Sequence, residues 1–320
     1  MAKRLKVNLA GGLGNQLNCY FAALYFAQKF GYELLTINYG TVNKIHIHPN
    51  SLINILPKSV LLKESKQIFI EFENIPTNLR LHGAFRSKGR HIYTLFKTLN
   101  GILDDSNYLS LPEHQYHEIC ESKFKIVSVN ASRDVRLNGF FPSQWFFQEL
   151  ESKFYSSNSM INFSKIVSSR DVRSKNTVSE PYCALHLRVG DYYLPGKNTF
   201  GVVDESYYLN AVLHLQKEFP GIKIWAVSDQ EILASKLYQR LLTKQVKLIR
   251  NLDKKSPLET FEFIRNANFV ICANSSFSYW AARLNPNIEK VVIPATPHLS
   301  IAGVKSLPNN WIRIENGFLK

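Results

Sequence analysis

The 320-residue sequence lacks any apolar run approaching the ~18 residues that a transmembrane helix needs. Its start, Met1-Ala2-Lys3-Arg4, leads through a short apolar segment into a glycine-rich turn, so the pattern of a signal peptide is absent too. We therefore expect a cytoplasmic protein with no membrane anchor. The hydrophobic content of 45% is enough for two domains of ordinary size, each with its own core.

Cysteine is scarce, and the sequence lacks the common metal and nucleophile motifs. Cys19, Cys120, Cys183 and Cys272 lie far apart within apolar runs and form no C-x-x-C pair, which favours buried, reduced thiols. We find no D-x-D after a strand, no P-loop, no H-E-x-x-H, no G-x-S-x-G and no cysteine and histidine cluster with zinc spacing. We therefore expect neither a metal ion nor a cofactor.

Acidic residues are in the minority, with 25 Asp and Glu against 39 Lys and Arg, for a net charge of +14. This excess favours a negatively charged partner: a nucleotide diphosphate, an anionic membrane face or nucleic acid. The densest basic stretch, Arg80 to Lys97, has no helix-turn-helix, zinc knuckle or RNP-type motif nearby. A solvated loop facing water or lipid headgroups explains it better, and we do not expect a nucleic-acid partner.

The first half of the chain opens as an α/β layer. A strand over Lys3–Ala10 runs into the turn Gly11–Gly14, a helix follows until Gly31, and Glu33–Tyr39 is a second strand. This order predicts a parallel sheet with a right-handed crossover. Further strands are predicted at Ile68–Phe72 and Lys125–Val129.

The second half alternates strands with helices at the spacing of a doubly wound parallel sheet. The predicted strands are 182–189, 222–227, 246–249, 269–273 and 290–293, and the predicted helices are 204–219, 231–242, 257–265 and 276–284. The region 156–180 is rich in Ser and Asn and reads as a connection. We predict a Rossmann-like domain over 1–155, a linker over 156–180, a second Rossmann-like domain over 181–300 and a tail over 301–320.

The strand Tyr182–Val189 carries two unusual polar residues. His186 and Arg188 project from one face at its carboxyl end, where open α/β sheets bind ligands, and Gly190-Asp191 follow. A guanidinium at a buried strand end must meet an anion, which is either Asp191, another carboxylate or a ligand phosphate. A structural Arg–Asp pair explains this strand alone equally well.

A second feature is the segment Asn274–Leu284, where small hydroxyl residues begin a helix after a strand. The free N–H groups of such a helix start form an anion site, to which the hydroxyls of Ser275 and Ser276 add donors. Serine caps mostly only start helices. Taken together with Arg188 on another strand of the same sheet, however, this cap favours a convergent phosphate site.

The third feature is the turn from Gly11 to Gln16. It is not the dinucleotide fingerprint G-x-G-x-x-G, because Leu17 stands at the last glycine position. One interpretation is a glycine turn with no role beyond connecting the strand to the helix. The other is a turn whose backbone approaches a ligand closely, with Asn15 and Gln16 adding amide side chains.

Together these motifs resemble those of the bacterial α-1,2-fucosyltransferases, glycosyltransferase family 11. The resemblance includes the aromatic segment Gly139–Phe147 and the strand end Ala226–Asp229, follows the family's order and covers residues 8 to 295. It implies two Rossmann-like domains facing a cleft, the GT-B type, with the first domain on the acceptor side and the second binding the donor.

The activity that the resemblance implies is transfer of L-fucose from GDP-β-L-fucose, with inversion and without a metal, to O-2 of a galactoside. The acceptor would be a surface glycan or oligosaccharide, as in lipopolysaccharide or O-antigen biosynthesis. A lipid-linked acceptor would bring this basic protein to the anionic inner face of the membrane.

The resemblance also implies roles for single residues. Arg188 would contact the β-phosphate, Ser275 and Ser276 the diphosphate, His186 and Asn268 the guanine and ribose, and Asn15 the transferred sugar. The other expected donor-binding residues are Gly12, Gly14, Gln16, Asp229, Asn274 and Ser278. The base that takes the acceptor's proton is Asp191, Asp204 or Glu205, and Asp191 would serve equally to hold Arg188.

Departures from the family pattern leave the sugar and the acceptor open. They are Asn18-Cys19, Val189, Gln230 and Phe261. One alternative is a transferase for another nucleotide sugar or linkage. A second, from another class, is a non-enzymatic basic protein that binds nucleic acid or an anionic surface.

Overall fold

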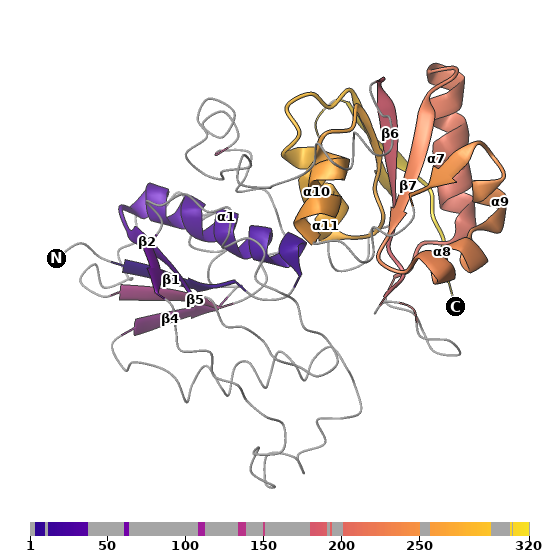
Figure 1. Ribbon diagram of the computed structural model, residues 1–320. Coiled ribbons are helices and arrows are strands. Elements are labelled where there is room, and N and C mark those ends of the chain that lie inside the picture. The colour runs from indigo at the N-terminus through magenta and orange to yellow at the C-terminus, as the bar shows by residue number, and fades with distance from the viewer. Residues whose placement is uncertain are drawn as a thin grey trace, which may run out of the picture. The chain divides into compact units, whose positions relative to one another are not determined.

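A computed structural model of the chain describes residues 4–9, 12–37, 61–63, 108–112, 134–138, 150, 180–190, 193, 201–249, 257–295, 308 and 310–319 (Figure 1). The expected strands at 68–72 and 125–129, the aromatic segment 139–147 and residue Asp191 lie outside these ranges. By their contacts the described residues form two compact units. The first holds residues 4–9, 19–37, 61–63, 108–112 and 134–138, and the second holds residues 12–18 and the described residues from 150 onward.

The first unit is a parallel sheet with a helix against it. Its elements are β1 (Arg4–Asn8), the part of α1 (Leu13–Phe30) from Cys19 onward, β2 (Glu33–Ile37), β3 (Leu61–Lys63), β4 (Tyr108–Pro112) and β5 (Asp134–Asn138). The strand order is β3-β2-β1-β5-β4, and every pairing is parallel. Gly31 ends α1 with φ of 72°, and the Tyr32 N–H donates to the Ala27 carbonyl at 2.9 Å. The predicted opening of the fold is confirmed.

The second unit is a larger parallel sheet with helices between its strands. Its elements are β6 (Tyr182–Leu187), α7 (Glu205–Glu218), β7 (Lys223–Ser228), α8 (Glu231–Leu237), α9 (Gln239–Leu242), β8 (Val246–Leu248), α10 (Pro257–Arg265), β9 (Phe269–Ile271), α11 (Ser276–Arg283), β10 (Lys290–Pro294) and β11 (Trp311–Ile314). The order is β11-β10-β9-β6-β7-β8. Each strand predicted in this half is present, and so is each predicted helix except that over 231–242, which is divided in two.

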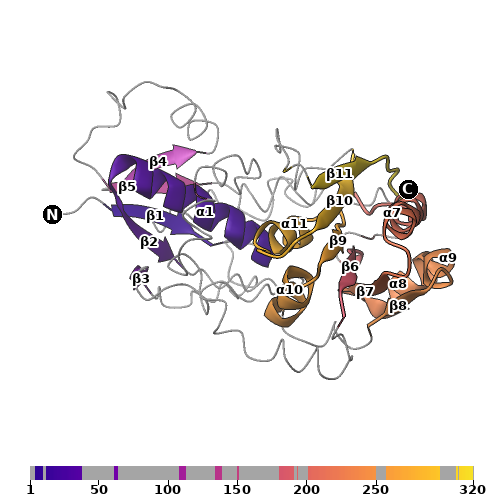
Figure 2. The same ribbon diagram turned by 90° about the horizontal axis from the view of Figure 1, so that it is seen from above.

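Helices cover both faces of this second sheet. α10 and α11 lie on one face, and α7, α8 and α9 lie on the other (Figures 1 and 2). The central strand β6 is buried along its whole length, as expected for a parallel strand covered on both faces. The sheet is therefore doubly wound, as the sequence predicts.

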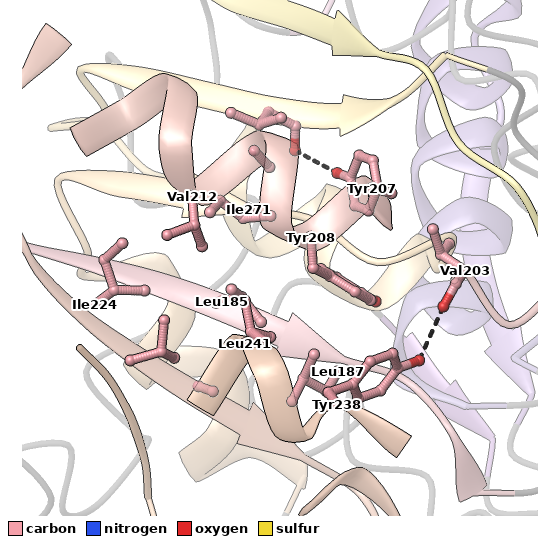
Figure 3. Close-up of a cluster of buried hydrophobic side chains, with 14 of the residues drawn as sticks. Leu185, Leu187, Val203, Tyr207, Tyr208, Val212, Ile224, Tyr238, Leu241 and Ile271 are labelled. Atoms are coloured by element: carbon pink, nitrogen blue, oxygen red, sulfur yellow. Dashed lines mark hydrogen bonds between the residues drawn. The ribbon is translucent and has the colours of Figure 1, made fainter. Parts of the chain in front are cut away.

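Three tyrosines anchor the core between α7, α8 and the sheet. Tyr207, Tyr208 and Tyr238 are fully buried, and each hydroxyl donates to a backbone carbonyl. Tyr238 reaches the carbonyl of Val203 at 2.9 Å (Figure 3). Its backbone is non-helical, with φ of −120° and ψ of 45°, so the single helix predicted over 231–242 is two helices. The break places the ring of Tyr238 against Tyr208, with 5.1 Å between centroids.

The predicted tail, residues 301–320, contains an additional strand. β11 pairs in parallel with β10, with Val291 opposite Trp311. Beyond it, the N–H of Leu319 donates to the carbonyl of Val202 at 2.9 Å. The described residues from 310 to 319 are thus part of the second unit, because the ladder to β10 and the burial of Trp311 hold them there.

Within the described ranges, no helix has both the length and the hydropathy that a membrane span requires.

Candidate functional site

The second sheet has one point at which its strand order reverses. The chain builds β6, β7 and β8 in one direction, then crosses to β9 beside β6 and continues to β10 and β11 in the other direction. Open α/β sheets bind ligands outside the carboxyl ends of the strands at such a point. Arg188 follows β6, and Asn274 and Ser275 follow β9, so the two polar motifs flank this reversal.

Helix α11 starts at this point with a serine cap. The Ser275 backbone is extended, and its Oγ accepts a hydrogen bond from the N–H of Phe277 at 3.3 Å. Ser275 and Ser276 are 5% and 7% exposed, so the helix start is largely shielded from water. The N-terminal end of a helix carries a partial positive charge and unpaired N–H groups, which suit an anion.

Arg188 is paired with Asp229, the residue that follows β7. Its Nη1 donates to Asp229 Oδ2, and the backbone N–H of Val189 donates to Asp229 Oδ1 at 3.0 Å. The side chains of Arg188 and Asp229 are 22% and 25% exposed, so both reach the surface at the strand ends. A ligand can approach the guanidinium there.

His186 is buried beside this pair and stays neutral. Its ring is 4% exposed and packs on Phe277 with 5.5 Å between centroids, while Nδ1 has no hydrogen-bond partner among the described residues. Burial, followed by the charge of Arg188, lowers the pKa of His186 from 6.5 to about 3. At neutral pH the ring is therefore an uncharged donor and acceptor.

Residues 12–18, which group with the second unit, contact the start of α11. A Cβ on Gly14 would lie 2.5 Å from the backbone nitrogen of Phe277, so only glycine fits this approach. The Oγ of Ser276 donates to Asn15 Oδ1 at 3.2 Å. Gly14 and Asn15 therefore lie against the serine cap, and Gly12 and Gln16 belong to the same turn, in which the N–H of Gln16 donates to the carbonyl of Gly12 at 3.0 Å.

Asn268 is not brought to this site. It precedes β9, its N–H donates to the carbonyl of Tyr182 at 3.1 Å, and its side chain donates to Glu289 at 2.9 Å. It therefore lies at the amino edge of the sheet, roughly 16 Å from the carboxyl end by the rise of five extended residues. Its place near the guanine and ribose, which the resemblance implies, stays a prediction.

Two other expected donor-binding residues have structural surroundings. Asn274 is 2% exposed, and its side-chain amide donates to the carbonyl of Gly201 at 3.1 Å. Ser278 is fully buried beside the Cys272 thiol and has no oxygen or nitrogen partner among the described residues. We assign both to the support of α11 and its preceding loop.

Two of the three candidate bases make structural contacts. Asp204 caps α7 by accepting from the N–H of Tyr207 at 3.2 Å. Glu205 accepts from Arg240, at 2.5 Å from Nε and 2.9 Å from the backbone N–H. In the ranges that the structure describes, no cluster of three or more His, Cys, Asp or Glu side chains is suited to hold a metal.

Sequence reasoning did not single out Asp229 as a partner of Arg188. It offered Asp191, another carboxylate or a ligand phosphate; the structure shows a pair with the carboxylate of Asp229, and Asp191 lies outside the described residues. Part of the signal was in the sequence, because Asp229 and Arg188 each lie at the end of a predicted strand and parallel strands end at the same edge of a sheet. That these two strands are neighbours is shown by the structure, in which β6 pairs with β7.

Known proteins similar to this chain were found by sequence and by structure. The profile of Glycosyl transferase family 11 matches residues 4–315. An α-1,2-colitosyltransferase of Escherichia coli is 24% identical over 254 residues, covering 74% of this chain and 86% of its own. The O-antigen biosynthesis glycosyltransferase WbnK of Escherichia coli is 25% identical over 337 residues, covering 96% and 99%.

Among solved structures, the fold is similar to NodZ, an α-1,6-fucosyltransferase co-crystallised with GDP. The TM-score is 0.53 at 12% identity, over 93% of this chain and 96% of that one. The predicted fold of the GT-B type is confirmed by this likeness. Because the family profile spans nearly the whole sequence, the chain belongs to glycosyltransferase family 11.

Proposed function

We propose that this glycosyltransferase moves L-fucose from GDP-β-L-fucose to O-2 of a galactoside in a surface glycan or oligosaccharide, with inversion and without a metal ion. The observation that carries the proposal is the convergence of Arg188 and the start of α11 on the strand reversal of the second sheet. The likeness to NodZ with bound GDP and to an α-1,2-transferase supports the donor and the linkage.

The chemistry follows from where charge develops. Displacement at the sugar carbon leaves negative charge on the departing diphosphate, and Arg188 with the α11 N–H groups would stabilise it. Such fixed donors act most strongly where charge appears in the transition state. Because Asp204 and Glu205 are held in structural contacts, we propose Asp191 as the base for the acceptor hydroxyl and Asn15 as a contact to the transferred sugar.

The test compares Arg188→Ala with Arg240→Ala in a GDP-fucose transfer assay. Loss of one transition-state donor typically lowers the rate by roughly 10²- to 10³-fold, which we expect for R188A in a folded protein. Arg240 is paired with Glu205 and its side chain is 71% exposed, so R240A should transfer at nearly the native rate. Equal transfer rates for both variants and the native protein would contradict the role of Arg188. Absence of transfer in all three, with retained binding to an anionic partner, would fit the non-enzymatic alternative.

A second candidate donor is the GDP derivative of colitose, a deoxy relative of L-fucose. It is favoured by the colitosyltransferase that is similar over 74% of this chain. Parallel incubations with GDP-fucose, GDP-colitose, GDP-mannose and a UDP-sugar distinguish the candidates. Turnover of one of the other donors, with no turnover of GDP-fucose, would show that L-fucose is not the transferred sugar.

We also propose that transfer needs no metal ion. The negative charge of the departing diphosphate would be met by Arg188 and the N–H groups at the start of α11. Transfer should be unchanged in excess EDTA. Loss of transfer that is restored by Mg²⁺ or Mn²⁺ would overturn it.

We further propose that the net charge of +14 brings the enzyme to an anionic membrane face when its acceptor is lipid-linked. Liposome flotation should recover the protein with anionic vesicles and not with neutral ones. Equal recovery with both would argue against this contact.

A further inference from the structure

One carboxylate at the end of β7 binds two consecutive residues at the end of β6 and lies against a third. Asp229 accepts a hydrogen bond from the guanidinium of Arg188 and another from the backbone N–H of Val189. The third residue, Gly190, leaves the space that the carboxylate fills, because a Cβ there would overlap Asp229 Oδ2. The Arg188 side chain and the Val189 backbone are therefore held by the same group, which Gly190 leaves room for.

The residue before Asp229 adds a second tie between the two strand ends. The Oγ of Ser228 donates to the carbonyl of Leu187 at 2.9 Å and accepts from the N–H of Gln230 at 3.1 Å. Leu187 and Ser228 are also paired in the strand register. The backbone on both sides of Arg188 is thus attached to the end of β7.

We infer that Asp229 is a positioning residue, which holds the Arg188 guanidinium where the departing diphosphate binds. The inference rests on the proposed role of Arg188. An arginine that is already ordered loses less rotamer freedom when the ligand binds, and a fixed donor needs no reorganisation during the reaction. A carboxylate would itself repel a diphosphate, so Asp229 acts through Arg188 and not by contact with the nucleotide.

Calorimetric titration with GDP and with guanosine tests this, because only GDP carries the diphosphate. Asp229→Asn keeps the shape of the side chain and removes its charge. We expect the affinity for GDP to fall about tenfold, in the range of couplings between contacting residues, while the affinity for guanosine is unchanged. In an Arg188→Ala background, D229N should have no further effect.

The matched control is Glu262→Gln, which changes another carboxylate paired with an arginine in the same unit. Glu262 accepts from Arg265 Nε at 2.5 Å and Nη2 at 2.9 Å within α10. E262Q should lower the melting temperature and leave the ratio of GDP to guanosine affinity as in the native protein. If D229N does not fold, Gly190→Ala tests the same role. This variant keeps the negative charge of Asp229, but the added Cβ displaces its carboxylate from Arg188.

The outcomes separate the two proposals. If R188A weakens GDP binding and neither D229N nor G190A does, the positioning role is refuted while the proposed function stands. If D229N weakens GDP binding by the same factor with and without Arg188, Asp229 contacts the nucleotide directly and the inference is wrong. If R188A leaves GDP affinity unchanged, Arg188 is not the diphosphate ligand and the proposed site itself fails.

Discussion

The hydroxyl of Tyr207 in α7 donates to the carbonyl oxygen of Cys272 at 2.8 Å. Cys272 immediately follows β9, two residues before Asn274, so this bond ties the helix on one face of the sheet to the strand end that leads into α11. Burial raises the pKa of Tyr207 well above its usual range, which keeps its proton in place as a donor.

Tyr207→Phe should destabilise the protein by about 1–3 kcal/mol, because the buried Cys272 carbonyl loses its short hydrogen bond. Urea unfolding of the native protein and the variant measures the loss. Tyr208→Phe is the variant for comparison, because the Tyr208 hydroxyl makes a longer hydrogen bond, of 3.2 Å, to the His186 carbonyl. We expect it to lose less stability than Y207F. An unchanged midpoint for Y207F would show that the bond contributes nothing.

The two serines at the start of α11 should differ in their effect on stability. Ser275 is the N-cap and accepts from the N–H of Phe277, so Ser275→Ala should cost ~1 kcal/mol. Ser276 lies inside the helix and its hydroxyl contacts Asn15, so Ser276→Ala should cost less. Thermal unfolding of the two variants makes the comparison, and a larger loss for S276A would contradict the assignment of the cap.

His186 should make stability depend on pH on the acid side. Its pKa is lowered from 6.5 to about 3 in the folded state, so between these values the unfolded chain binds more protons than the folded one. The stabilising contribution of the neutral ring is complete above the usual pKa and is lost as the pH falls toward 3.

Unfolding in urea at about pH 7 and about pH 5, on either side of the usual histidine pKa, measures this decline. His186→Asn should reduce the difference between the two conditions, because asparagine does not titrate. The same decline in the native protein and in H186N would assign it to other groups.

Much of the second unit was predictable because its strands are short apolar runs separated by clear helix boundaries. Pro257 at a helix start and Pro220-Gly221 after another are local signals that need no tertiary contact. The split at Tyr238 was not predictable, because it depends on a ring and a hydroxyl that pack against residues distant in the sequence.

The sequence predicted the positions of the polar motifs along the second sheet better than it predicted their side-chain contacts. Arg188 and the serine cap follow strands, and strand direction alone places them at one edge of the sheet. The same rule puts Asn268, which precedes its strand, at the other edge of the sheet. The pairing of Arg188 with Asp229 depends on side-chain geometry across 41 positions, which no local pattern contains.

The measurement that tests the central claim most directly is linkage analysis of the product formed from GDP-fucose and a panel of β-galactosides. We predict a product with L-fucose linked α-1,2 to galactose, formed by the native enzyme and lost in R188A. A fucosylated product with another linkage, or no use of GDP-fucose while another nucleotide sugar is consumed, would contradict the proposed function.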